Sequence, residues 1–591
     1  MALVQSSGPP FVPPPADLTL PEVFLDRKLK HSTTTQEYPQ IPTLIDAESG
    51  RTVFLSELRN RTDCLARSFA KQFGLVSLLA ANHTDYPVCI WAAHRLGAIV
   101  APTSPGLTTG ELSNRPKSMY SSMFDADDFL LGYQFEVTKP SIIIADAENV
   151  SIAAQAAKRH NISRSRIIVL GGDPTGEATA YESVNVLINH GRHLPNIHTF
   201  RLEPGAGSSK VAFLCFSSGT TGKPKAVSIS HQTAICNVLQ LATFDGLNMN
   251  LPGVEPRYRP GDVCTGVLPL YHIYGLAMNL HFILYCQMTL VITRKFDFLK
   301  FLEGIKKYRI THLMIVPPQV ILLCKHPAAL KADLSGIRYC MVAAAPLTIE
   351  LTQHLIKKLP NACLGQGYGM TEMCGAVSMW PLSQRIGTVG SGGQLISGTT
   401  AKVVKSDGSI AAIGESGELW VKGNQITLGY YKNEASTREA FQNGWYKTGD
   451  EVKIDSNGDL FIIDRIKEMI KVKGFQVAPA ELEGHLIDHP SIAEVGVIGV
   501  PDEYAGELPL AFIVLRQQAA EEIKNNPAAA SSLKADIYKF VKNAKSRYKW
   551  LDGGIEFVDS IPKSPSGKIL RRILRDSIVN KTRTPHVKPK L

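Results

Sequence analysis

The stretch FLCFSSGTTGKPK, residues 213–225, decides the interpretation of this sequence. An apolar run leads into nine residues that contain two serines, two threonines, two glycines and two lysines. Small residues let backbone N–H groups approach an anion closely, hydroxyl groups add donors, and lysine adds positive charge. The two glycines stand too close together for a Walker loop. The stretch therefore predicts another kind of polyphosphate loop at the end of a strand, formed by Ser217, Ser218, Gly219, Thr220, Thr221 and Lys225.

Composition and charge exclude several classes of protein. The chain has 591 residues, of which 44% are hydrophobic and 20% charged, as in ordinary globular proteins with several domains. The net charge is +10, but residues 568–591 alone carry eight basic residues against one acidic residue. The rest of the chain is nearly neutral, so we expect no basic face for nucleic acid.

Cysteine spacing and the longest apolar run also bear on the class of protein. None of the ten cysteines forms a C-x-x-C pair or stands at zinc-finger spacing, and most lie in apolar runs, which predicts buried, reduced thiols. The apolar run 276–292 is interrupted by Asn279, His281 and Gln287. It predicts a buried helix that leads into a strand rather than a membrane span.

Alternating apolar runs and helical patterns predict parallel sheets with helical crossovers in the first two thirds of the chain. Beyond about residue 400 the pattern changes to strands joined by the turns SDG (406–408) and SNG (456–458). A compact α+β unit is expected from Ile466 onward. The predicted elements are helices over 88–96, 152–159, 301–307, 479–488 and 529–544, and strands over 98–101, 141–145, 167–170, 311–316, 401–404, 417–422, 450–454, 460–464, 493–500 and 508–515.

Five further motifs follow the phosphate loop, and together they resemble one known superfamily. The whole pattern, from about residue 55 to 572, resembles the acyl-adenylate-forming enzymes, which include acyl-CoA synthetases, luciferases and adenylation domains. Within that superfamily it is most similar to 4-coumarate–CoA ligase-like enzymes. The motifs are LPLYHIYG (268–275), QGYGMTE (366–372), YKTGD (446–450), DRIKEMIKVKGFQ (464–476) and PSGK (565–568).

The resemblance implies an α/β fold with a large N-terminal domain of parallel-type sheets and helices, a β-rich subdomain, and a small mobile α+β C-terminal domain. The expected boundaries are a loose proline-containing leader (1–40), an AMP-binding domain (41–465), a lid (466–575) and a basic tail (576–591). The implied activity is that of an acid–CoA ligase. ATP and a carboxylic acid give acyl-AMP and pyrophosphate, and the thiol of coenzyme A then displaces AMP.

The resemblance also assigns roles to single residues. Lys568 and His272 would act at the reacting carboxylate and phosphate, and Thr371 would bind the α-phosphate. Glu372 would bind Mg²⁺, for which a carboxylate is a suitable hard ligand. Asp450 would hold the ribose hydroxyls. Further residues at matching positions would contact ATP or AMP, namely Gln366, Gly367, Arg465, the hinge residue Lys467, Lys471 and Gln476.

Coenzyme A and the acid occupy separate sets of positions in the same pattern. Lys295, Lys473 and Gly474 match positions near coenzyme A. The matching acid pocket is mostly apolar or small, which favours an aromatic or medium-chain aliphatic acid, as in enzymes of secondary metabolism. Its residues are Tyr274, Met278, Ala343, Gly367, Ala376 and Val377.

The sequence departs from the superfamily pattern in two places. A loop usually written GAAPL reads AAAPL at 343–347, and the extra methyl group of Ala343 would narrow the pocket. Residues 113–132 interrupt a helix that would otherwise run from 108–112 directly into Tyr133. We interpret the interruption as an inserted surface loop or as the translation of an unspliced intron.

Several further functions stay open at this point. An amino-acid-activating module would place an aspartate in the pocket motif, and 271–275 contain none. A stand-alone adenylating enzyme, a luciferase-like oxygenase that uses acyl-AMP, and a catalytically inactive binding protein are three more hypotheses. Retention of Lys568, Asp450 and Glu372 argues against the inactive protein.

The end of the chain bears on the cellular location. The terminal tripeptide Pro589-Lys590-Leu591 differs from the peroxisomal address S-K-L by one residue. A peroxisomal import receptor is therefore a candidate partner. The expected location is peroxisome or cytoplasm.

Overall fold

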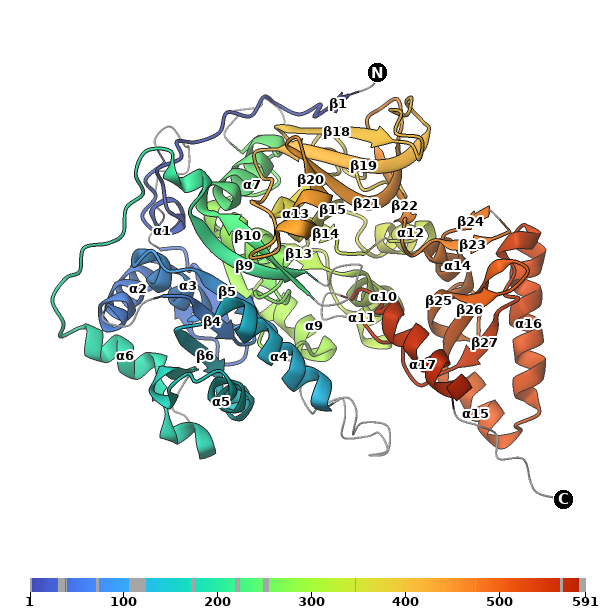
Figure 1. Cartoon of the computed structure of the whole chain (residues 1–591), viewed down its shortest axis with the longest axis horizontal. Coiled ribbons are helices and arrows are strands. Elements are labelled where there is room, and N and C mark those ends of the chain that lie inside the picture. The colour runs from blue at the N-terminus through green and yellow to red at the C-terminus, as the bar shows by residue number, and fades with distance from the viewer. Residues whose placement is uncertain are drawn as a thin grey trace.

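The computed structural model describes residues 3–29, 38, 40–70, 74–105, 124–171, 176–217, 224–247, 255–345, 347–473, 475–563 and 567–583. The described strands form four sheets, three in a larger N-terminal part and one in a C-terminal unit that lies beside it (Figure 1). The predicted α/β class is therefore confirmed. The change from the last strand of the larger part to the first of the C-terminal unit falls between Arg465 and Ile470.

A seven-stranded sheet contains the strand that leads into the phosphate loop. Neighbouring strands of this sheet run parallel, with one exception. After the loop, β10 folds back and pairs antiparallel with β9. The strand predicted over 167–170 is found with the same bounds. The strand predicted over 98–101 is found two residues later, over 100–103. In spatial order the strands are β10 (Lys225–Ser230), β9 (Val211–Ser217), β5 (Val100–Thr103), β4 (Val76–Leu79), β6 (Ile142–Asp146), β7 (Ile167–Leu170) and β8 (Glu182–Ser183).

A nine-stranded sheet carries the second cluster of motifs at its edge. Its centre is parallel, and its two ends turn antiparallel. Buried Leu, Ile, Val and Met residues fill the central strands, as expected for a sheet covered on both faces. In order the strands are β17 (Gln394–Leu395), β16 (Gly375–Met379), β15 (Cys363–Met370), β14 (Tyr339–Val342), β13 (His312–Ile315), β11 (Val263–Gly266), β12 (Thr289–Ile292), β2 (Leu44–Asp46) and β3 (Thr52–Val53).

A six-stranded antiparallel sheet follows, as the hairpin turns predicted. The turn signals at 406–408 and 456–458 each include a glycine with positive φ, Gly408 and Gly458. The sheet places Asp450 and Arg465 opposite each other on adjacent strands. Its strands are β1 (Val4–Gln5), β18 (Thr399–Val404), β19 (Ser416–Gly423), β21 (Trp445–Ile454), β20 (Phe441–Gln442) and, beside β21, β22 (Leu460–Arg465).

The N-terminal segment is not the loose leader that its prolines suggested. Val4 pairs with Ala401 in β18, the carbonyl of Pro14 accepts a hydrogen bond from Gln232, and that of Ala16 accepts one from Gly207. Proline lacks an N–H group but still offers its carbonyl, so a proline-rich segment can be fastened by accepting hydrogen bonds. This part of the expectation is corrected for residues 3–29.

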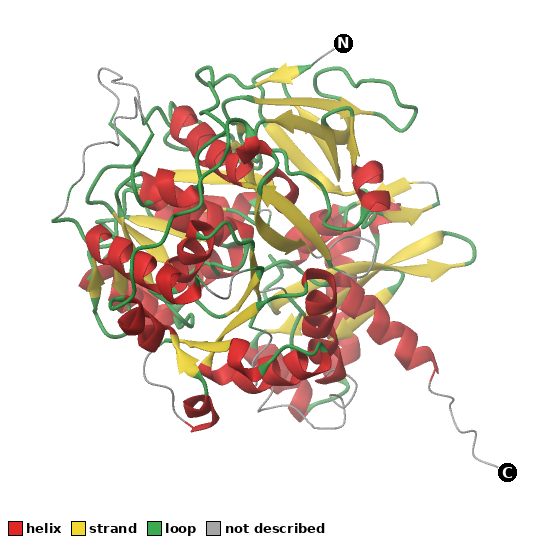
Figure 2. Ribbon diagram, turned by 60° about the vertical axis from the view of Figure 1, so that its left-hand side comes forward, coloured by secondary structure: helices red, strands yellow, loops and turns green. Residues whose placement is uncertain are grey.

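The C-terminal unit is a five-stranded sheet with helices. The helix predicted over 529–544 has those bounds, and the strand over 508–515 begins two residues earlier. The last helix, α17 (Arg571–Arg583), runs outward toward the C-terminal end (Figure 2). The strands are β24 (Phe475–Val477), β23 (Ile470–Val472), β26 (Gly506–Leu515), β25 (Ile492–Asp502) and β27 (Gly554–Phe557), and the other helices are α14 (Pro479–Leu486), α15 (Gln517–Asn525) and α16 (Ala529–Ala544).

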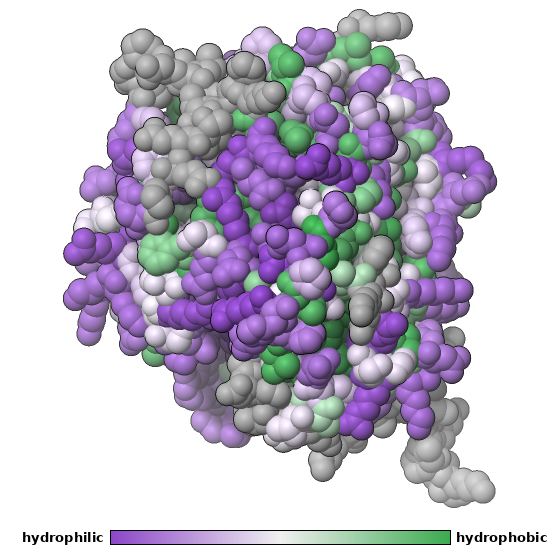
Figure 3. All heavy atoms as spheres, turned by 90° about the vertical axis from the view of Figure 1, so that its left-hand side faces the viewer, coloured by the Kyte–Doolittle hydropathy of each residue, from purple (hydrophilic) through white to green (hydrophobic). Residues whose placement is uncertain are grey.

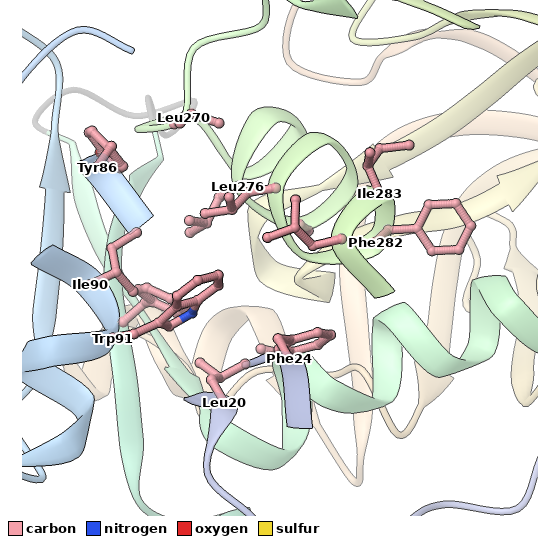
Figure 4. Packing of buried hydrophobic residues seen from close by; sticks show 14 of the residues in the cluster. Leu20, Phe24, Tyr86, Ile90, Trp91, Leu270, Leu276, Phe282 and Ile283 are labelled. Carbon is pink, nitrogen blue, oxygen red and sulfur yellow. The ribbon is translucent and has the colours of Figure 1, made fainter. Parts of the chain in front are cut away.

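Helices of the larger part pack against its sheets and against one another. Leu20 and Phe24 of the first helix point into the same core as Trp91 and Leu276 (Figure 4). The described helices of this part are α1 (Leu20–Phe24), α2 (Leu55–Phe69), α3 (Tyr86–Arg95), α4 (Phe124–Thr138), α5 (Val150–Arg159), α6 (Val184–Gly191), α7 (His231–Phe244), the π-helix η7 (Tyr274–Phe282), α8 (Ile283–Tyr285), α9 (Phe298–Lys307), α10 (Pro317–Lys325), α11 (Pro327–Lys331), α12 (Ile349–Lys358) and α13 (Glu434–Ala440).

Helix α4 corrects part of the expectation for the atypical segment 113–132. Residues 124–132 are helical and continue without a break into Tyr133. Leu131 and Phe135 stand four residues apart and are both buried, so the apolar side of the helix extends upstream of Tyr133. The rest of that segment, residues 113–123, lies outside the described residues.

The remaining expectations about burial and membranes concern the whole molecule. All ten cysteines are free, and eight of them are buried. The run 276–292 forms the buried π-helix, a short α-helix and β12, as predicted. Among the described residues, no helix is both long and apolar enough to cross a bilayer. The face of the molecule drawn in Figure 3 is mostly hydrophilic, with hydrophobic residues scattered across it.

Candidate active site

Asp450 is the centre of a three-residue polar cluster. The Tyr368 hydroxyl of β15 donates to one Asp450 carboxylate oxygen at 2.5 Å, and Arg465 Nε lies 3.4 Å from the other. Burial raises the pKa of Asp450, and the Arg465 charge and the Tyr368 hydrogen bond oppose that rise. The cluster presents a buried carboxylate and a guanidinium at one place, a suitable arrangement for vicinal hydroxyls and a phosphate.

Glu372 lies in a short 3₁₀ helix, η8 (Thr371–Met373), directly after β15. One of its carboxylate oxygens, Oε1, accepts hydrogen bonds from the hydroxyls of Ser217 and Tyr430, both at 3.0 Å. Ser217 ends the strand before the phosphate loop, so the loop and the QGYGMTE motif meet at this carboxylate. Thr371 begins the same helix, half-buried, beside Glu372.

The other described end of the phosphate loop is Lys225, the first residue of β10. Its ammonium lies 4.9 Å from the centre of the Tyr430 ring. Ser217 and Lys225 are register partners, so the antiparallel turn of the sheet brings both ends of the loop together. The predicted phosphate ligands Ser218, Gly219, Thr220 and Thr221 lie outside the described residues.

His272 is held in one tautomer by the chain that carries it. Its Nδ1 accepts a hydrogen bond from the backbone N–H of Tyr274 at 3.2 Å. In the neutral ring Nε2 must then carry the proton and can donate it to a ligand oxygen. Burial, and secondarily the charge of Lys568, lower the pKa of His272 to about 4, so the ring is neutral at neutral pH.

Asn82 fastens the segment that leads to His272. Its amide donates to the carbonyls of Gly266 and Leu268 at 3.1 and 2.9 Å and accepts from the N–H of Leu270 at 2.8 Å. Asn82 is buried and follows β4, so it ties the end of the seven-stranded sheet to the LPLYHIYG motif.

Lys568 comes from the C-terminal unit, yet two of the charged groups that act on it, Arg465 and Asp450, belong to the larger part. Burial lowers its pKa to about 8, Arg465 adds to that effect, and Glu468 and Asp450 oppose it. The neighbouring Gly567 contacts Pro318 at the start of α10, since a Cβ there would lie 3.2 Å from the proline ring. The structure thus brings Lys568, Asp450, Arg465 and His272 together.

The residues predicted to line the acid pocket do not all face one space. Tyr274, Met278 and Ala376 belong to one buried cluster, and Ala343 packs against it half-buried. Val377 of β16 packs in a different cluster, against residues of the six-stranded sheet. Ala376 and Val377 therefore pack into different clusters, at a point where the pairing of β15 with β16 shifts register, and only Ala376 joins the cluster of Tyr274 and Met278.

The strand β15 places two more predicted residues beside this pocket. Gln366 is buried, pairs with Val342 of β14, and its Oε1 has no hydrogen-bond partner among the described residues. A Cβ at Gly367 would lie 2.6 Å from Met341 Cε, so the absence of a side chain at Gly367 leaves room for the Met341 side chain. The Tyr274 hydroxyl is likewise buried without a partner in the described part of the chain.

Three of the residues predicted to serve AMP or coenzyme A, Lys471, Lys473 and Gln476, make their contacts away from the cluster around Asp450. Lys471 and Gln476 pair across the β23–β24 hairpin, and Lys473 in its turn lies 4.3 Å from the Tyr504 ring. These contacts remain within the C-terminal unit. Gly474 lies outside the described residues, and Lys295 and Lys467 are exposed.

Two functional candidates carry no signal in the sequence motifs. Tyr430 contacts both Glu372 and Lys225, but it lies in a loop far from either along the chain. Asn82 stands almost two hundred residues before the motif that it fastens. Only the folded arrangement brings these partners together.

Comparison with known proteins decides the family. A model of the AMP-binding enzyme family matches residues 32–431, and a model of the AMP-binding enzyme C-terminal domain matches 481–568. This chain belongs to the AMP-binding enzyme family. It is an AMP-forming acid–CoA ligase that works through an acyl-adenylate, as the sequence predicted, and its use of ATP and coenzyme A follows from that class.

Two relatives and one solved structure illustrate the similarity of this AMP-binding enzyme to known proteins. It is 33% identical to 4-coumarate-CoA ligase 1 of Narcissus pseudonarcissus, over 94% of this chain and 95% of that protein. It is 33% identical to acyl-CoA ligase AFT1-1 of Alternaria alternata, over 96% and 97% respectively. The crystal structure of the anthranilate CoA ligase AuaEII with anthranoyl-AMP has the same fold, with a TM-score of 0.78 and 22% identity over 96% of this chain and 98% of that one.

Proposed function

We propose that the cluster around Asp450 binds ATP and that Lys568 and His272 act on the acid during adenylation. The carboxylate attacks the α-phosphorus of ATP, the bond to the bridging oxygen breaks, and pyrophosphate leaves. The Lys568 ammonium and the His272 Nε2–H would neutralise charge on the carboxylate and phosphate oxygens, while Asp450 accepts from the ribose hydroxyls. The observation that carries this proposal is the convergence of Lys568, from the C-terminal unit, on Asp450, Arg465 and His272.

Glu372 is the residue that would hold Mg²⁺. Its hydrogen bonds from Ser217 and Tyr430 both go to Oε1, and the described residues contain no group of three His, Cys, Asp or Glu side chains that could form a complete metal site. Magnesium is commonly bound through one carboxylate together with the phosphates of the substrate. A single buried carboxylate beside the phosphate loop fits that mode, in which the ion neutralises phosphate charge.

We propose that Lys467, Lys471, Gln476, Lys473, Gly474 and Lys295 serve the second half-reaction. There the thiol of coenzyme A attacks the acyl carbon, and the bond to the AMP oxygen breaks. In this structure the contacts of Lys471 and Lys473 stay within the C-terminal unit, whereas Lys568 reaches the larger part. This arrangement suits adenylation, and a turn about Lys467 would suit thioester formation.

An aromatic acid is the proposed substrate. The pocket residues Tyr274, Met278 and Ala376 are apolar or aromatic and buried, with two polar atoms, Tyr274 OH and Gln366 Oε1, that the described residues leave without a partner nearby. Relatives named for 4-coumarate and a structural neighbour with anthranoyl-AMP add support. A screen of carboxylic acids by coenzyme A-dependent AMP release tests this, and a preference for medium-chain aliphatic acids would replace it.

Lys568→Ala tests the catalytic assignment. We expect at least a hundredfold loss of acid-dependent ATP–pyrophosphate exchange, because one positioned charge in a partly buried site contributes roughly 3 kcal/mol to a transition state. Thioester formation from supplied acyl-AMP should remain, since pyrophosphate has already left at that stage. Unchanged exchange would refute the role of Lys568.

We also propose that the C-terminal tripeptide directs the enzyme to the peroxisome. The support is its likeness to the address S-K-L, from which it differs only at Pro589. The location of a fluorescent protein that carries residues 576–591 tests this. Uniform fluorescence through the cytoplasm would refute it.

A further inference from the structure

Arg571 is the first residue of α17 and stands three residues after Lys568. Its side chain is 9% exposed, and every nitrogen of its guanidinium has a partner. Nη1 donates to Glu468, Nη2 donates to both oxygens of Glu483 at 2.9 and 2.8 Å, and Nε donates to the carbonyl of Val497 at 3.1 Å. A planar guanidinium with a bidentate partner fixes orientation as well as position.

The partners of Arg571 come from three separate elements. Glu483 lies in α14 and also accepts the backbone N–H of Val497 in β25 at 2.8 Å. Glu468 lies in the turn that follows β22, and its own N–H bonds to the carbonyl of Arg465 at 2.9 Å. Through Glu468, Arg571 is therefore tied to the backbone of the residue that pairs with Asp450.

The segment that carries Lys568 is held at its base, and Gly567 lies close to the larger part. The N–H of Leu570 bonds to the carbonyl of Pro562 at 2.8 Å, and Lys563 forms an antiparallel β-bridge with Ile569. At the other end Gly567 contacts Pro318. The place of Gly567 and Lys568 is therefore linked to the start of α17, where Arg571 lies.

We propose that Arg571, held by Glu468 and Glu483, is a positioning residue that sets the place of Lys568 for adenylation. The inference rests on the role of Lys568 proposed above. Arg571 itself would touch neither ATP nor the acid. It acts by fixing the start of α17 and by linking that helix to the turn after Arg465.

The first test separates positioning from general damage to the fold. We expect Arg571→Gln to lower ATP–pyrophosphate exchange roughly tenfold to a hundredfold, because misplacing a catalytic group by about 1 Å can cost that much. Thioester formation from supplied acyl-AMP should fall less than threefold. Arg572→Gln is the matched control, since Arg572 is 73% exposed and next in the same helix. Equal losses in both half-reactions would overturn the proposal.

The second test removes one charge near Lys568 and follows the pH dependence of pyrophosphate exchange. Its outcome is separate from the test of the catalytic role of Lys568. The charged groups around Lys568 are Arg465, Glu468, Asp450 and Arg571, with His272 also facing it, and Glu468 raises its pKa whereas Arg571 lowers it. Glu468→Gln should therefore move the alkaline limit of pyrophosphate exchange to lower pH, and Arg571→Gln should move it to higher pH, each by roughly half a unit. If the alkaline limit moved in the same direction in both variants, or in neither, the positioning role of Arg571 would be refuted. An active Lys568→Ala enzyme would instead refute the catalytic role of Lys568, on which this inference rests.

Discussion

At the scale of single residues, burial changes His272 and Lys568 in ways that suit one reaction. The pKa of His272 falls to about 4, which leaves a neutral ring with a proton on Nε2. The pKa of Lys568 falls only to about 8, which leaves an ammonium through most of the neutral range. A neutral donor and a cation can therefore face the same oxygens without repelling each other strongly.

This difference predicts the pH dependence of adenylation. Lys568 is charged below its folded pKa of about 8, so pyrophosphate exchange should fall as the pH rises through that value. A guanidinium does not lose its proton in this range, so Lys568→Arg should retain a lower but pH-independent rate up to pH ~10. An unchanged alkaline limit in Lys568→Arg would assign the titration to another group.

Tyr368 gives a second prediction at this scale. Tyr368→Phe removes the hydroxyl that donates to Asp450 at 2.5 Å and leaves a buried carboxylate short of one donor. Loss of a hydrogen bond to a charged group costs roughly 1.5–3 kcal/mol, so we expect the KM for ATP to rise at least tenfold. Tyr538→Phe is the control, because Tyr538 donates to Asp552 at 2.7 Å on the exposed side of the C-terminal unit. Equal KM values in the two variants would contradict the assignment.

At the scale of elements, the π-helix η7 places the pocket residues. Its second residue, Gly275, passes so close to the preceding segment that a Cβ would lie 2.0 Å from the carbonyl oxygen of Pro269. Only glycine permits that approach, and the approach sets the direction in which Tyr274 and Met278 leave the backbone.

Gly275→Ala should therefore displace the start of η7. We expect loss of both half-reactions and a lower unfolding temperature, because the clash is with backbone that cannot move aside by a rotamer change. Gly304→Ala in α9 is the control, since its Cβ would meet nothing nearer than Tyr308 at 3.9 Å. Both properties are measured beside that control. If Gly275→Ala kept full activity and an unchanged unfolding temperature, the backbone around Pro269 would be able to shift and make room for the methyl group.

The helices and strands also show how much of the fold and of the site could be predicted from the sequence alone. Local patterns were sufficient for α16 and β7, where apolar spacing and flanking residues agree with the fold. They were insufficient at β16, where Ala376 and Val377 look equally suited to the pocket, but in the fold they pack into different clusters beside a shift in register. The motifs named Asp450, Glu372 and His272, but Tyr430 and Asn82 act through contacts between distant segments and leave no local pattern.

At the scale of the whole molecule, the N-terminal segment joins parts that are far apart in the chain. It adds β1 to the six-stranded sheet and then packs Leu20 and Phe24 into the core of the larger part. A chain that lacks residues 1–8 should lose the pairing with β18 and the Ser6–Leu395 hydrogen bond. We expect its apparent unfolding temperature to fall by roughly 1–2 °C with little change in kcat. An unchanged thermal transition by calorimetry would show that β1 adds no stability.

The pairing of Val4 with Ala401 has a consequence for synthesis of the chain. At roughly 5–20 residues per second, Val4 leaves the ribosome about 20–80 s before its partner strand exists. During that wait the segment is an unpaired edge that other chains could join. Prolines follow it at 9, 10 and 13–15, and because proline lacks the N–H group that strand pairing needs, they limit that exposed edge to the few residues around β1 until β18 is made.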